Sequence, residues 1–305
     1  MSSSTRLTLT VDNLNSSGEG VARRGRDVYF VPGALPGEEV EVVLDGRRRK
    51  VWQTRLLNIM TASEHRVDPA CPHYKRCGGC NMQHLSYDEQ VNFKQQRVAR
   101  EFERQKIEVE HWAQAITSEP FGYRRKARLG VRLSKQSKQN IVGFREAASS
   151  HLTNIDRCIV LPEHSALNWQ QWREVINGLQ GKAHITQIEM VQADNAIALV
   201  FRVLKPLVQS DQQQLIDTVA DITNELPVQL WLKFDKDQAP QLIYPQEAEP
   251  LTHTVDQQTL NIQLDDFVQV NRSVNQAMVT QALDWLNPQP EDCVWDMFAG
   301  PGNFS

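Results

Sequence analysis

Three cysteines stand close together in the first third of the sequence, and a fourth follows far downstream. Their spacing begins as C-x5-C-x2-C, and the full set is Cys71, Cys77, Cys80 and Cys158. Thiolates two residues apart can bind one tetrahedral metal ion or two corners of an iron–sulfur cluster. Zinc sites usually consist of two close pairs, whereas a triad in one loop with a distant partner favours a cluster. Structural zinc and simple burial in a core are the alternatives.

A second chemical motif stands near the end of the sequence. Asp296, Phe298, Gly300 and Gly302 occupy every second position of the pattern D-x-F-x-G-x-G. Glycines permit a tight turn and let the backbone approach a ligand, which the N-terminus of a following helix would face. Dinucleotide sites usually carry G-x-G-x-x-G, and the third glycine is missing here. The motif therefore indicates a nucleoside-bearing cofactor, with adenosylmethionine ahead of NAD.

Cations and aromatic residues interleave in segment 121–129, which contains Arg124, Arg125, Lys126 and Arg128. This composition is typical of a strand that contacts RNA, although an exposed hairpin whose arginine stems cover apolar surface is the plain alternative. Residues 1–150 contain 25 Lys and Arg against 17 Asp and Glu, while residues 151–305 contain 8 against 20. A basic first half favours contact with a polyanion, but two solvated surfaces of opposite charge would give the same totals.

The elements that must position these residues follow from hydrophobic periodicity. Residues 6–60 contain short alternating segments separated by Gly, Pro and Asp, a pattern typical of a small β-barrel. A helix is expected to begin at Ser86, with Ser86 and Glu89 forming a capping box. Single helices between strands then indicate an α+β region. The expected helices cover 163–179 and begin again at Ser210, and the expected strands cover 184–191, 196–204 and 228–234.

The last segment predicts the opening of a further domain. Ser273 is expected to cap a helix, and the residues from Cys293 predict a buried strand that runs into the glycine turn, with Cys293 facing the core. A strand followed by a glycine turn opens a doubly wound, Rossmann-like α/β domain. Such a sheet needs several more strands and helices. We therefore expect the chain, which ends at Ser305, to be a C-terminally truncated fragment.

The totals and patterns together predict a multidomain α+β protein. At 305 residues and 40% hydrophobic composition, the chain can bury two or three cores. The expected domains are an OB-like barrel over 1–62, a central domain with the cysteine loop and the basic strand over 63–262, and the beginning of the α/β domain over 263–305. No apolar run is long enough for a membrane helix, and the N-terminus lacks a signal-peptide core. We expect a cytoplasmic monomer without membrane contact.

Several segments together resemble the RNA uracil carbon-5 methyltransferases, along essentially the whole chain. They are GEGVAR and VYFVPGALPGE in the barrel, RVDPACPHYKRCGGCNMQHLSY around the cysteines, F-x-Q-x-N at 267–271, and the terminal glycine motif. The barrel resembles a TRAM domain. Barrel and cysteine loop together point to the branch of the family that acts on 23S ribosomal RNA, because the tRNA branch lacks both.

The resemblance implies two cofactors and a set of residues for each. In the family, three clustered cysteines and one later cysteine bind a 4Fe-4S cluster, which corresponds here to Cys71, Cys77, Cys80 and Cys158. The glutamine of F-x-Q-x-N contacts S-adenosyl-L-methionine and corresponds to Gln269. The glycine motif adds Phe298 and Asn303, beside Asp296, Gly300 and Gly302. The implied partner is 23S ribosomal RNA, with Arg124, Arg125, Lys126 and Arg128 as the RNA-binding residues.

The reaction implied by the resemblance is methylation of carbon-5 of a uridine. A cysteine thiolate adds to carbon-6, carbon-5 then takes the methyl group, and a base removes the proton. The family's nucleophile and base follow the first cofactor motif at a distance, so both are expected beyond Ser305 and none within the chain. Two other functions stay open. One is a radical adenosylmethionine methylthiotransferase, which pairs a TRAM domain with a C-x3-C-x2-C loop. The other is a non-catalytic RNA-binding protein with zinc or a cluster.

Overall fold

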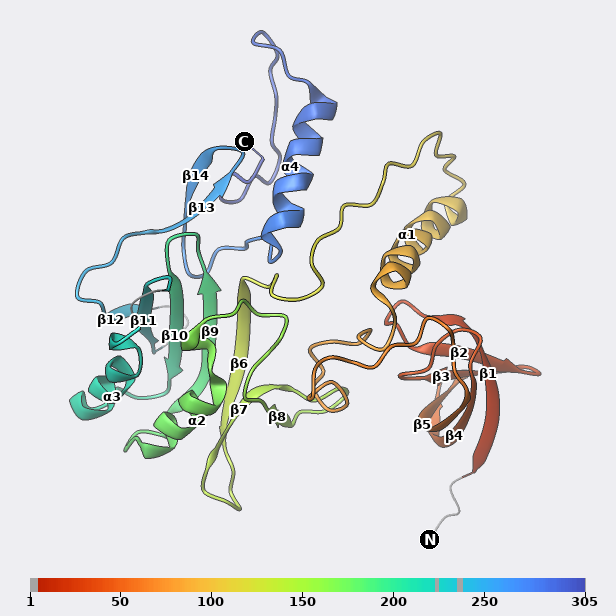
Figure 1. Ribbon diagram of the computed structural model, residues 1–305, viewed down its shortest axis with the longest axis horizontal. Coiled ribbons are helices and arrows are strands. Elements are labelled where there is room, and N and C mark those ends of the chain that lie inside the picture. Colours follow the sequence, from red (N-terminus) through yellow and green to blue (C-terminus); the bar gives the residue numbers. More distant parts are fainter. Residues whose placement is uncertain (1–4, 223–224, 235–237, 305) are drawn as a thin grey trace. The chain divides into compact units, whose positions relative to one another are not determined.

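The computed structural model describes residues 5–222, 225–234 and 238–304, which form two compact units that divide after Ala115 (Figure 1). The first unit contains the strands and the helix of the N-terminal region, and the second contains the remaining sheets and helices. Ser305, the last residue of the predicted glycine turn, lies outside the described residues. The expected division into three domains stays a prediction.

A closed five-stranded barrel forms the first part of the chain, as the alternating pattern predicts. Its strands, in the order β1-β2-β3-β5-β4 around the barrel, are β1 (Arg6–Leu14), β2 (Gly20–Arg24), β3 (Asp27–Val31), β5 (Val51–Thr61) and β4 (Glu39–Arg48). Alternate residues point inward, and Val11, Val31 and Val40 are at most 1% exposed. Gly20 is required by close packing, because a Cβ there would lie 3.0 Å from both Val11 Cγ1 and the Ala34 carbonyl oxygen.

A single helix, α1 (Tyr87–Arg104), follows the cysteine loop. Ser86 is its N-cap residue, as predicted, but the Ser86 side chain makes no capping hydrogen bond. The predicted capping box is therefore wrong. The Glu89 carboxylate instead accepts a hydrogen bond from Asn92 Nδ2 at 3.2 Å, a neighbour on the same helix face that competes for the glutamate.

The second unit contains a seven-stranded mixed sheet in the order β12-β11-β10-β9-β6-β7-β8. Its strands are β6 (Lys126–Leu133), β7 (Asn140–Arg145), β8 (Leu152–Asn154), β9 (Ile185–Gln192), β10 (Ile197–Val203), β11 (Val228–Lys233) and β12 (Gln241–Tyr244). Strands β6 and β9 pair antiparallel from Lys126 opposite Val191 to Gly130 opposite Gln187. This pairing joins the meander β6-β7-β8 to the hairpin β9-β10.

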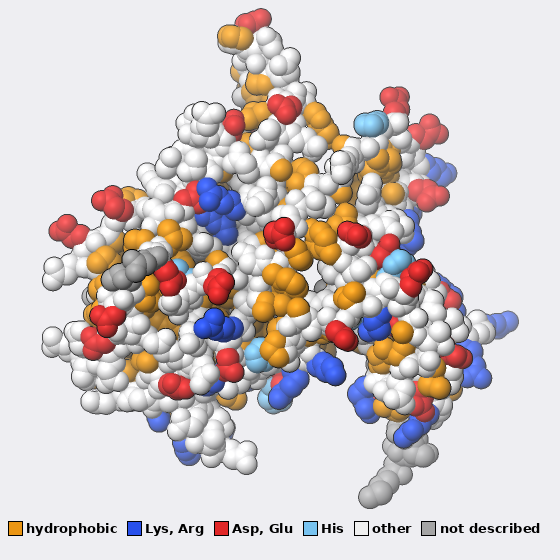
Figure 2. All heavy atoms as spheres, in the orientation of Figure 1, with side chains coloured by type: hydrophobic (Ala, Val, Ile, Leu, Met, Phe, Trp, Pro, Cys, Tyr) orange, Lys and Arg blue, Asp and Glu red, His pale blue; other side chains and the backbone are white. Residues whose placement is uncertain are grey.

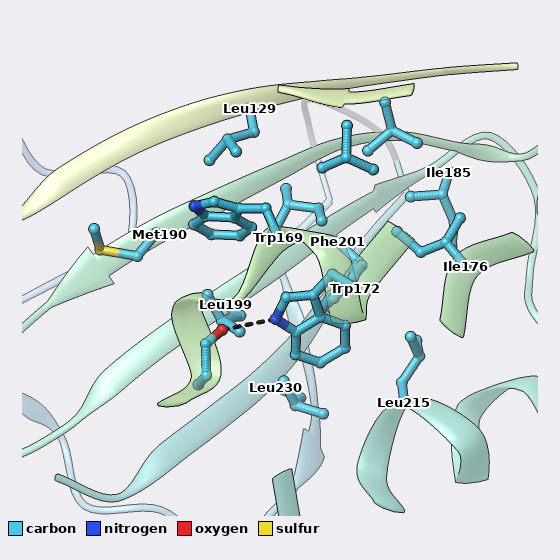
Figure 3. Packing of buried hydrophobic residues seen from close by; sticks show 14 of the residues in the cluster. Leu129, Trp169, Trp172, Ile176, Ile185, Met190, Leu199, Phe201, Leu215 and Leu230 are labelled. Atoms are coloured by element: carbon cyan, nitrogen blue, oxygen red, sulfur yellow. Dashed lines mark hydrogen bonds between the residues drawn. The ribbon is translucent and has the colours of Figure 1, made fainter. Parts of the chain in front are cut away.

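Two helices, α2 (Trp169–Gly178) and α3 (Gln209–Ala220), and a 3-10 turn, η1 (Ser165–Leu167), accompany this sheet. The helices confirm the two expected segments, but α3 begins after Val208, so Ser210 lies inside it and is not its cap. Both helices contribute to one core with alternate residues of the sheet. Trp172 packs edge-on against Phe201, with ring centroids 5.1 Å apart, and its Nε1 donates to the Ala166 carbonyl oxygen at 2.7 Å. Figure 3 shows Trp172 and Phe201 within this core.

A second, smaller core lies on the opposite face of the sheet. It includes Val191 and Ala198 from the sheet, Leu251 and Ile262 from the hairpin β13 (Leu251–Val255) and β14 (Gln258–Ile262), and Val268. The last helix, α4 (Arg272–Leu286), follows directly. This core therefore attaches the segment before α4 to the sheet.

Asn271, and not Ser273 as predicted, is the N-cap of α4, because its Oδ1 accepts a hydrogen bond from the Val274 amide at 3.1 Å. The surface of α4 and of the segment after it carries apolar side chains (Figure 2), including Trp285 at 70% and Trp295 at 78% exposure. Across the described residues, no helix combines the length and apolarity that crossing a membrane requires.

Candidate functional site

The cysteine loop is closed at its base by backbone pairing. The Val67 amide donates to the His84 carbonyl oxygen at 3.0 Å, and the Ser86 amide donates to that of His65 at 2.9 Å. Asn81 Nδ2 donates to the Ser17 carbonyl oxygen at 2.6 Å, which ties the loop to the turn after β1. The loop is therefore held against the barrel within the first unit.

A buried ion pair also stabilises the two ends of the cysteine loop where they meet the barrel. The Glu38 side chain is fully buried and receives Arg66 Nε at 2.5 Å and Arg66 Nη2 at 2.8 Å. The amides of Leu35 and Ser63 donate to the same carboxylate at 2.8 and 3.2 Å. Burial raises the pKa of Glu38, but these hydrogen bonds outweigh burial and hold the pKa below its usual range. Arg66 thus connects the barrel to the start of the cysteine loop.

Inside the loop, the three thiols are half-buried. The Cys77 amide donates to the His73 carbonyl oxygen at 2.8 Å, and Cys77 Sγ accepts the Gly79 amide at 3.4 Å. Burial raises the pKa of Cys77, and the charges of Cys80 and Cys71 raise it further. Their chemistry fits a thiophilic metal or cluster. In the described part of the chain, however, no three His, Cys, Asp or Glu side chains are arranged to hold a metal ion.

Cys158 belongs to the second unit, where it is half-buried against the core under the sheet. Because the other three cysteines belong to the first unit, the four-cysteine ligand set stays a prediction. Within its own unit Cys158 lies beside the basic segment, because the Arg124 amide donates to the Val160 carbonyl oxygen at 2.8 Å and the Gly122 amide to that of Ile159 at 2.9 Å.

The four predicted RNA-binding cations have different surroundings. Arg125 is 6% exposed and donates to Asp194, and burial lowers its pKa. Lys126 Nζ donates to the carbonyl oxygens of Leu264 at 2.9 Å and Asp266 at 2.6 Å. These two cations therefore hold the protein together, a role that the interleaved composition did not indicate.

Arg124 and Arg128 differ from the two internal cations. The Arg128 side chain is 59% exposed and pairs with Glu189 at 3.2 Å. Arg124 is half-buried, and its Nε donates to the Lys126 carbonyl oxygen at 3.1 Å. RNA contact by the four cations stays a prediction, and Arg128 is the one with the most accessible guanidinium.

A pocket of about 520 Å³ brings together the residues of the two cofactor motifs, although they lie far apart in the sequence. Gln269 lies in its wall with the predicted residues Asp296, Phe298, Gly300 and Asn303. Gly302 is not among the lining residues. The positive φ angles of Gly300 and Gly302, 59° and 84°, form the turn that the glycine pattern predicts.

The loop is fixed to α4 by a reciprocal pair of amides. Asn275 Nδ2 donates to Asn303 Oδ1 at 2.8 Å, and Asn303 Nδ2 donates to Asn275 Oδ1 at 3.0 Å. Asn275 is 8% exposed, so its amide needs such a partner. The sequence did not single out Asn275. Its only signal is a polar residue on the buried face of the helix.

The predicted strand from Cys293 is absent, and this prediction is wrong for the described chain. The segment before the glycine turn has no strand hydrogen bonding, Cys293 is exposed, and Phe298 is 100% exposed. A parallel strand forms only beside neighbouring strands that satisfy its backbone groups, and the described residues offer none at this place. Trp295 Nε1 donates instead to Cys293 Sγ at 3.2 Å.

Further residues were not predicted for this pocket because they come from separate elements. They are Arg125 directly before β6, His253 and Thr254 from β13, and Arg272 and Gln276 from α4. The Arg125 amide donates to the Val270 carbonyl oxygen at 2.9 Å, beside Gln269. Burial lowers the pKa of His253, with nearby Arg125 as the next cause. The imidazole is therefore neutral at physiological pH.

Comparison with known proteins agrees with the barrel and with the fold. Residues 4–50 match the model of the TRAM domain. A crystal structure of Pyrococcus abyssi tRNA (uracil-54, C5)-methyltransferase, in complex with S-adenosyl-L-homocysteine, shares the fold with a TM-score of 0.70 and 19% identity, over 97% of this chain and 69% of that one.

Relatives with higher identity are 23S rRNA (uracil(1939)-C(5))-methyltransferases RlmD. The protein from Shewanella sediminis is 36% identical over 99% of this chain and 67% of its own length. That from Erwinia tasmaniensis is 40% identical over 98% of this chain and 66% of its own length. The chain thus spans about two thirds of the length of these curated relatives. It belongs to the RlmD family of 23S rRNA uracil-C5 methyltransferases.

Proposed function

We propose that the chain provides the RNA-binding part and part of the cofactor site of an enzyme that methylates carbon-5 of a uridine in 23S ribosomal RNA, with S-adenosyl-L-methionine as methyl donor. The pocket is the observation that carries this proposal, because it joins Gln269 to the Asp296–Asn303 loop. A protein that only binds RNA has no need for such a pocket. The names of the relatives supply the substrate, and the fold shared with a tRNA methyltransferase agrees with the reaction class.

Binding of S-adenosyl-L-homocysteine, followed by titration calorimetry, tests the cofactor site. The chain is expected to bind it, and Gln269→Ala is expected to weaken binding by about tenfold through the loss of a hydrogen bond in the pocket. Gln213→Ala on the exposed side of α3 serves as the matched control. Absence of binding by the unaltered chain would refute the proposed cofactor site, and equal affinity of the two variants would remove Gln269 from it.

We also propose that Cys71, Cys77, Cys80 and Cys158 hold a 4Fe-4S cluster. The donor set supports it, since three half-buried thiols share one short loop that is tied to the barrel. A cluster with four cysteine ligands leaves no iron open to a substrate, so it would support the fold and not the methyl transfer. This ligand count also argues against a radical adenosylmethionine enzyme, which needs one open iron.

Metal analysis after anaerobic purification distinguishes the cluster from zinc. A cluster gives a brown protein with about four irons per chain. Stoichiometric zinc without visible absorbance would refute it and favour a zinc protein. Cys77→Ser removes one proposed ligand. Cys293→Ser is its control, because Cys293 is exposed and outside the proposed ligand set.

RNA contact is proposed for the basic segment, with Arg124 and Arg128 as the residues to test. Each cation that neutralises a phosphate adds about 0.7–0.9 to the slope of log affinity against log salt concentration. Arg124→Gln and Arg128→Gln together are therefore expected to weaken RNA binding and lower that slope by about 1.4 to 1.8. Arg173→Gln on α2, where Arg173 pairs with Asp156 at 2.7 Å, is the control. An unchanged slope would exclude this segment from the RNA interface.

A further inference from the structure

One carboxylate bridges two arginines in the wall of the candidate cofactor pocket. Arg125 Nη2 donates to Asp194 Oδ1, and Arg272 Nη2 lies 3.2 Å from Asp194 Oδ2. Both arginines line the pocket, while Asp194 stands behind them. Arg125 lies directly before β6, Asp194 in the turn after β9 and Arg272 in the first turn of α4. The bridge therefore joins three elements at one place.

Asp194 is itself held in place by the backbone. The Asp194 amide donates to the Thr252 carbonyl oxygen at 2.8 Å, and Asp194 Oδ2 accepts the Thr254 amide at 2.8 Å. Asn195 Oδ1 accepts the Thr252 amide at 3.0 Å, so three hydrogen bonds join the turn to β13. Burial raises the pKa of Asp194, but the Thr254 amide and Arg125 outweigh it and keep the carboxyl ionised at neutral pH. The two guanidinium groups therefore contact a carboxylate whose position is fixed by the backbone.

The bridge leaves a positive charge in the pocket wall. Two guanidinium groups share one carboxylate, and neutral His253 adds no further charge. A guanidinium has five N–H donors, of which the contact with Asp194 uses a part. Among the described lining residues Asp296 is the sole acid, and it comes from the glycine loop. The pocket therefore pairs a cationic side with a single acidic group.

We propose that Arg125 and Arg272, oriented by Asp194, form an oxyanion-binding subsite of this pocket. The inference rests on the proposed function, and it names the group recognised: the carboxylate of the amino-acid end of adenosylmethionine. Planar guanidinium groups bind carboxylates in fixed geometry, and a partly desolvated pair does so more strongly than a surface lysine. Asp296 is the complementary group for the ammonium of the same amino-acid end. A phosphate of the RNA backbone has the same oxyanion chemistry and is the second source to be tested.

Asp194 is a positioning residue in this scheme. It does not line the pocket, but its removal frees Arg125 to turn toward other acceptors and leaves a buried cation without its partner. Arg272 is the residue to vary first, because its side chain is 59% exposed and the fold does not depend on burying it. Asp194→Asn keeps the size of the side chain and removes only its charge.

The decisive experiment compares two ligands on the full chain by calorimetry. They are S-adenosyl-L-homocysteine and its decarboxylated analogue S-adenosyl-3-thiopropylamine, which lacks the carboxylate alone. The unaltered chain is expected to bind the first about 10- to 100-fold more tightly, as a charge-assisted contact implies. Arg272→Gln should lose most of that preference and leave the affinity for the analogue unchanged. Asp194→Asn should reduce the preference in the same direction, and Arg173→Gln should not alter it.

A second arm measures binding of a short single-stranded oligoribonucleotide at several salt concentrations. If Arg272→Gln lowers the salt slope while the preference between the two small ligands is unchanged, the oxyanion is an RNA phosphate. If Arg272→Gln changes neither measurement, the subsite is refuted, although binding of S-adenosyl-L-homocysteine still supports the proposed function. If the unaltered chain binds neither ligand class, the subsite and the proposed function fail together.

Discussion

Replacing Arg66 by methionine tests whether the ion pair with Glu38 fixes the barrel and the cysteine loop. Methionine keeps the length of the apolar stem but removes both contacts to the Glu38 carboxylate, at 2.5 and 2.8 Å, and the contact to the Gly33 carbonyl oxygen at 2.7 Å. The carboxylate then remains fully buried with two backbone donors, from Leu35 and Ser63. Removing one partner of a buried pair costs about 3–5 kcal/mol. The two remaining donors place the expected loss near the lower limit, at about 3 kcal/mol.

The loss of stability in Arg66→Met should depend on pH in a defined direction. In the unaltered chain the pKa of Glu38 lies below its usual value, so the carboxylate stabilises the fold at neutral pH, and this stabilisation is lost as pH falls through the folded pKa. Without Arg66, burial becomes the main influence and raises the pKa. The variant then gains relative stability as pH falls from 7 toward 4.5 and the carboxyl takes up a proton. The difference in stability between the unaltered chain and the variant should narrow by about 1.4 kcal/mol for each unit by which the pKa of Glu38 rises.

Hydrogen exchange of the β4 amides, read by mass spectrometry on the full chain, measures the local free energy of opening. Arg6→Met is the control, because Arg6 is 69% exposed and its 3.5 Å pair with Glu41 is worth at most about 1 kcal/mol. The reasoning is refuted if the Arg66 variant loses less than about 1 kcal/mol of opening free energy. It is also refuted if the difference in opening free energy from the unaltered chain does not change with pH.

Three further changes have clear expected results. Cys77→Ser should abolish the visible absorbance and iron of the anaerobically purified chain while Cys293→Ser keeps both, as metal analysis will show; iron in both variants would contradict the ligand set. Gly143→Ala should destabilise the second unit by about 1–3 kcal/mol in urea unfolding, because its Cβ would lie 1.9 Å from the Thr153 carbonyl oxygen. Gly178→Ala is the matched control and should be neutral or slightly stabilising, because its Cβ would lie 3.7 Å from Gln214 Oε1, its nearest neighbour. Trp172→Phe should lose about 2 kcal/mol in the same assay through a lost 2.7 Å hydrogen bond and a small cavity.

Local patterns predicted the barrel and the helices, because each element there depends mainly on its own periodicity. The closed barrel and α2 follow from alternating and helical spacing of apolar residues. Cap residues were less predictable, since several polar residues compete for the same amides. Asn271 takes the cap position expected of Ser273, and Glu89 is engaged by Asn92.

The site was predictable only where one short motif contains its residues. Gln269 and Asp296 were found from their motifs, and the structure places both in one pocket. Arg125 was identified as a cation, but its burial against Asp194 was not predicted, because Asp194 is 69 residues away and no local pattern connects them. The strand expected at Cys293 shows the same limit, since a parallel strand depends on neighbours that its own sequence does not specify.

The pairing of β6 with β9 has a consequence for synthesis of the chain on the ribosome. About 60 residues separate the starts of the two strands, so β6 emerges several seconds before its partner at ordinary translation rates. During that interval one edge of β6 has no strand beside it, and such edges invite pairing with other chains unless charged residues discourage it. Lys126 and Arg128 lie on this strand. We therefore expect these cations to protect the nascent meander from aggregation before β9 arrives to complete the sheet.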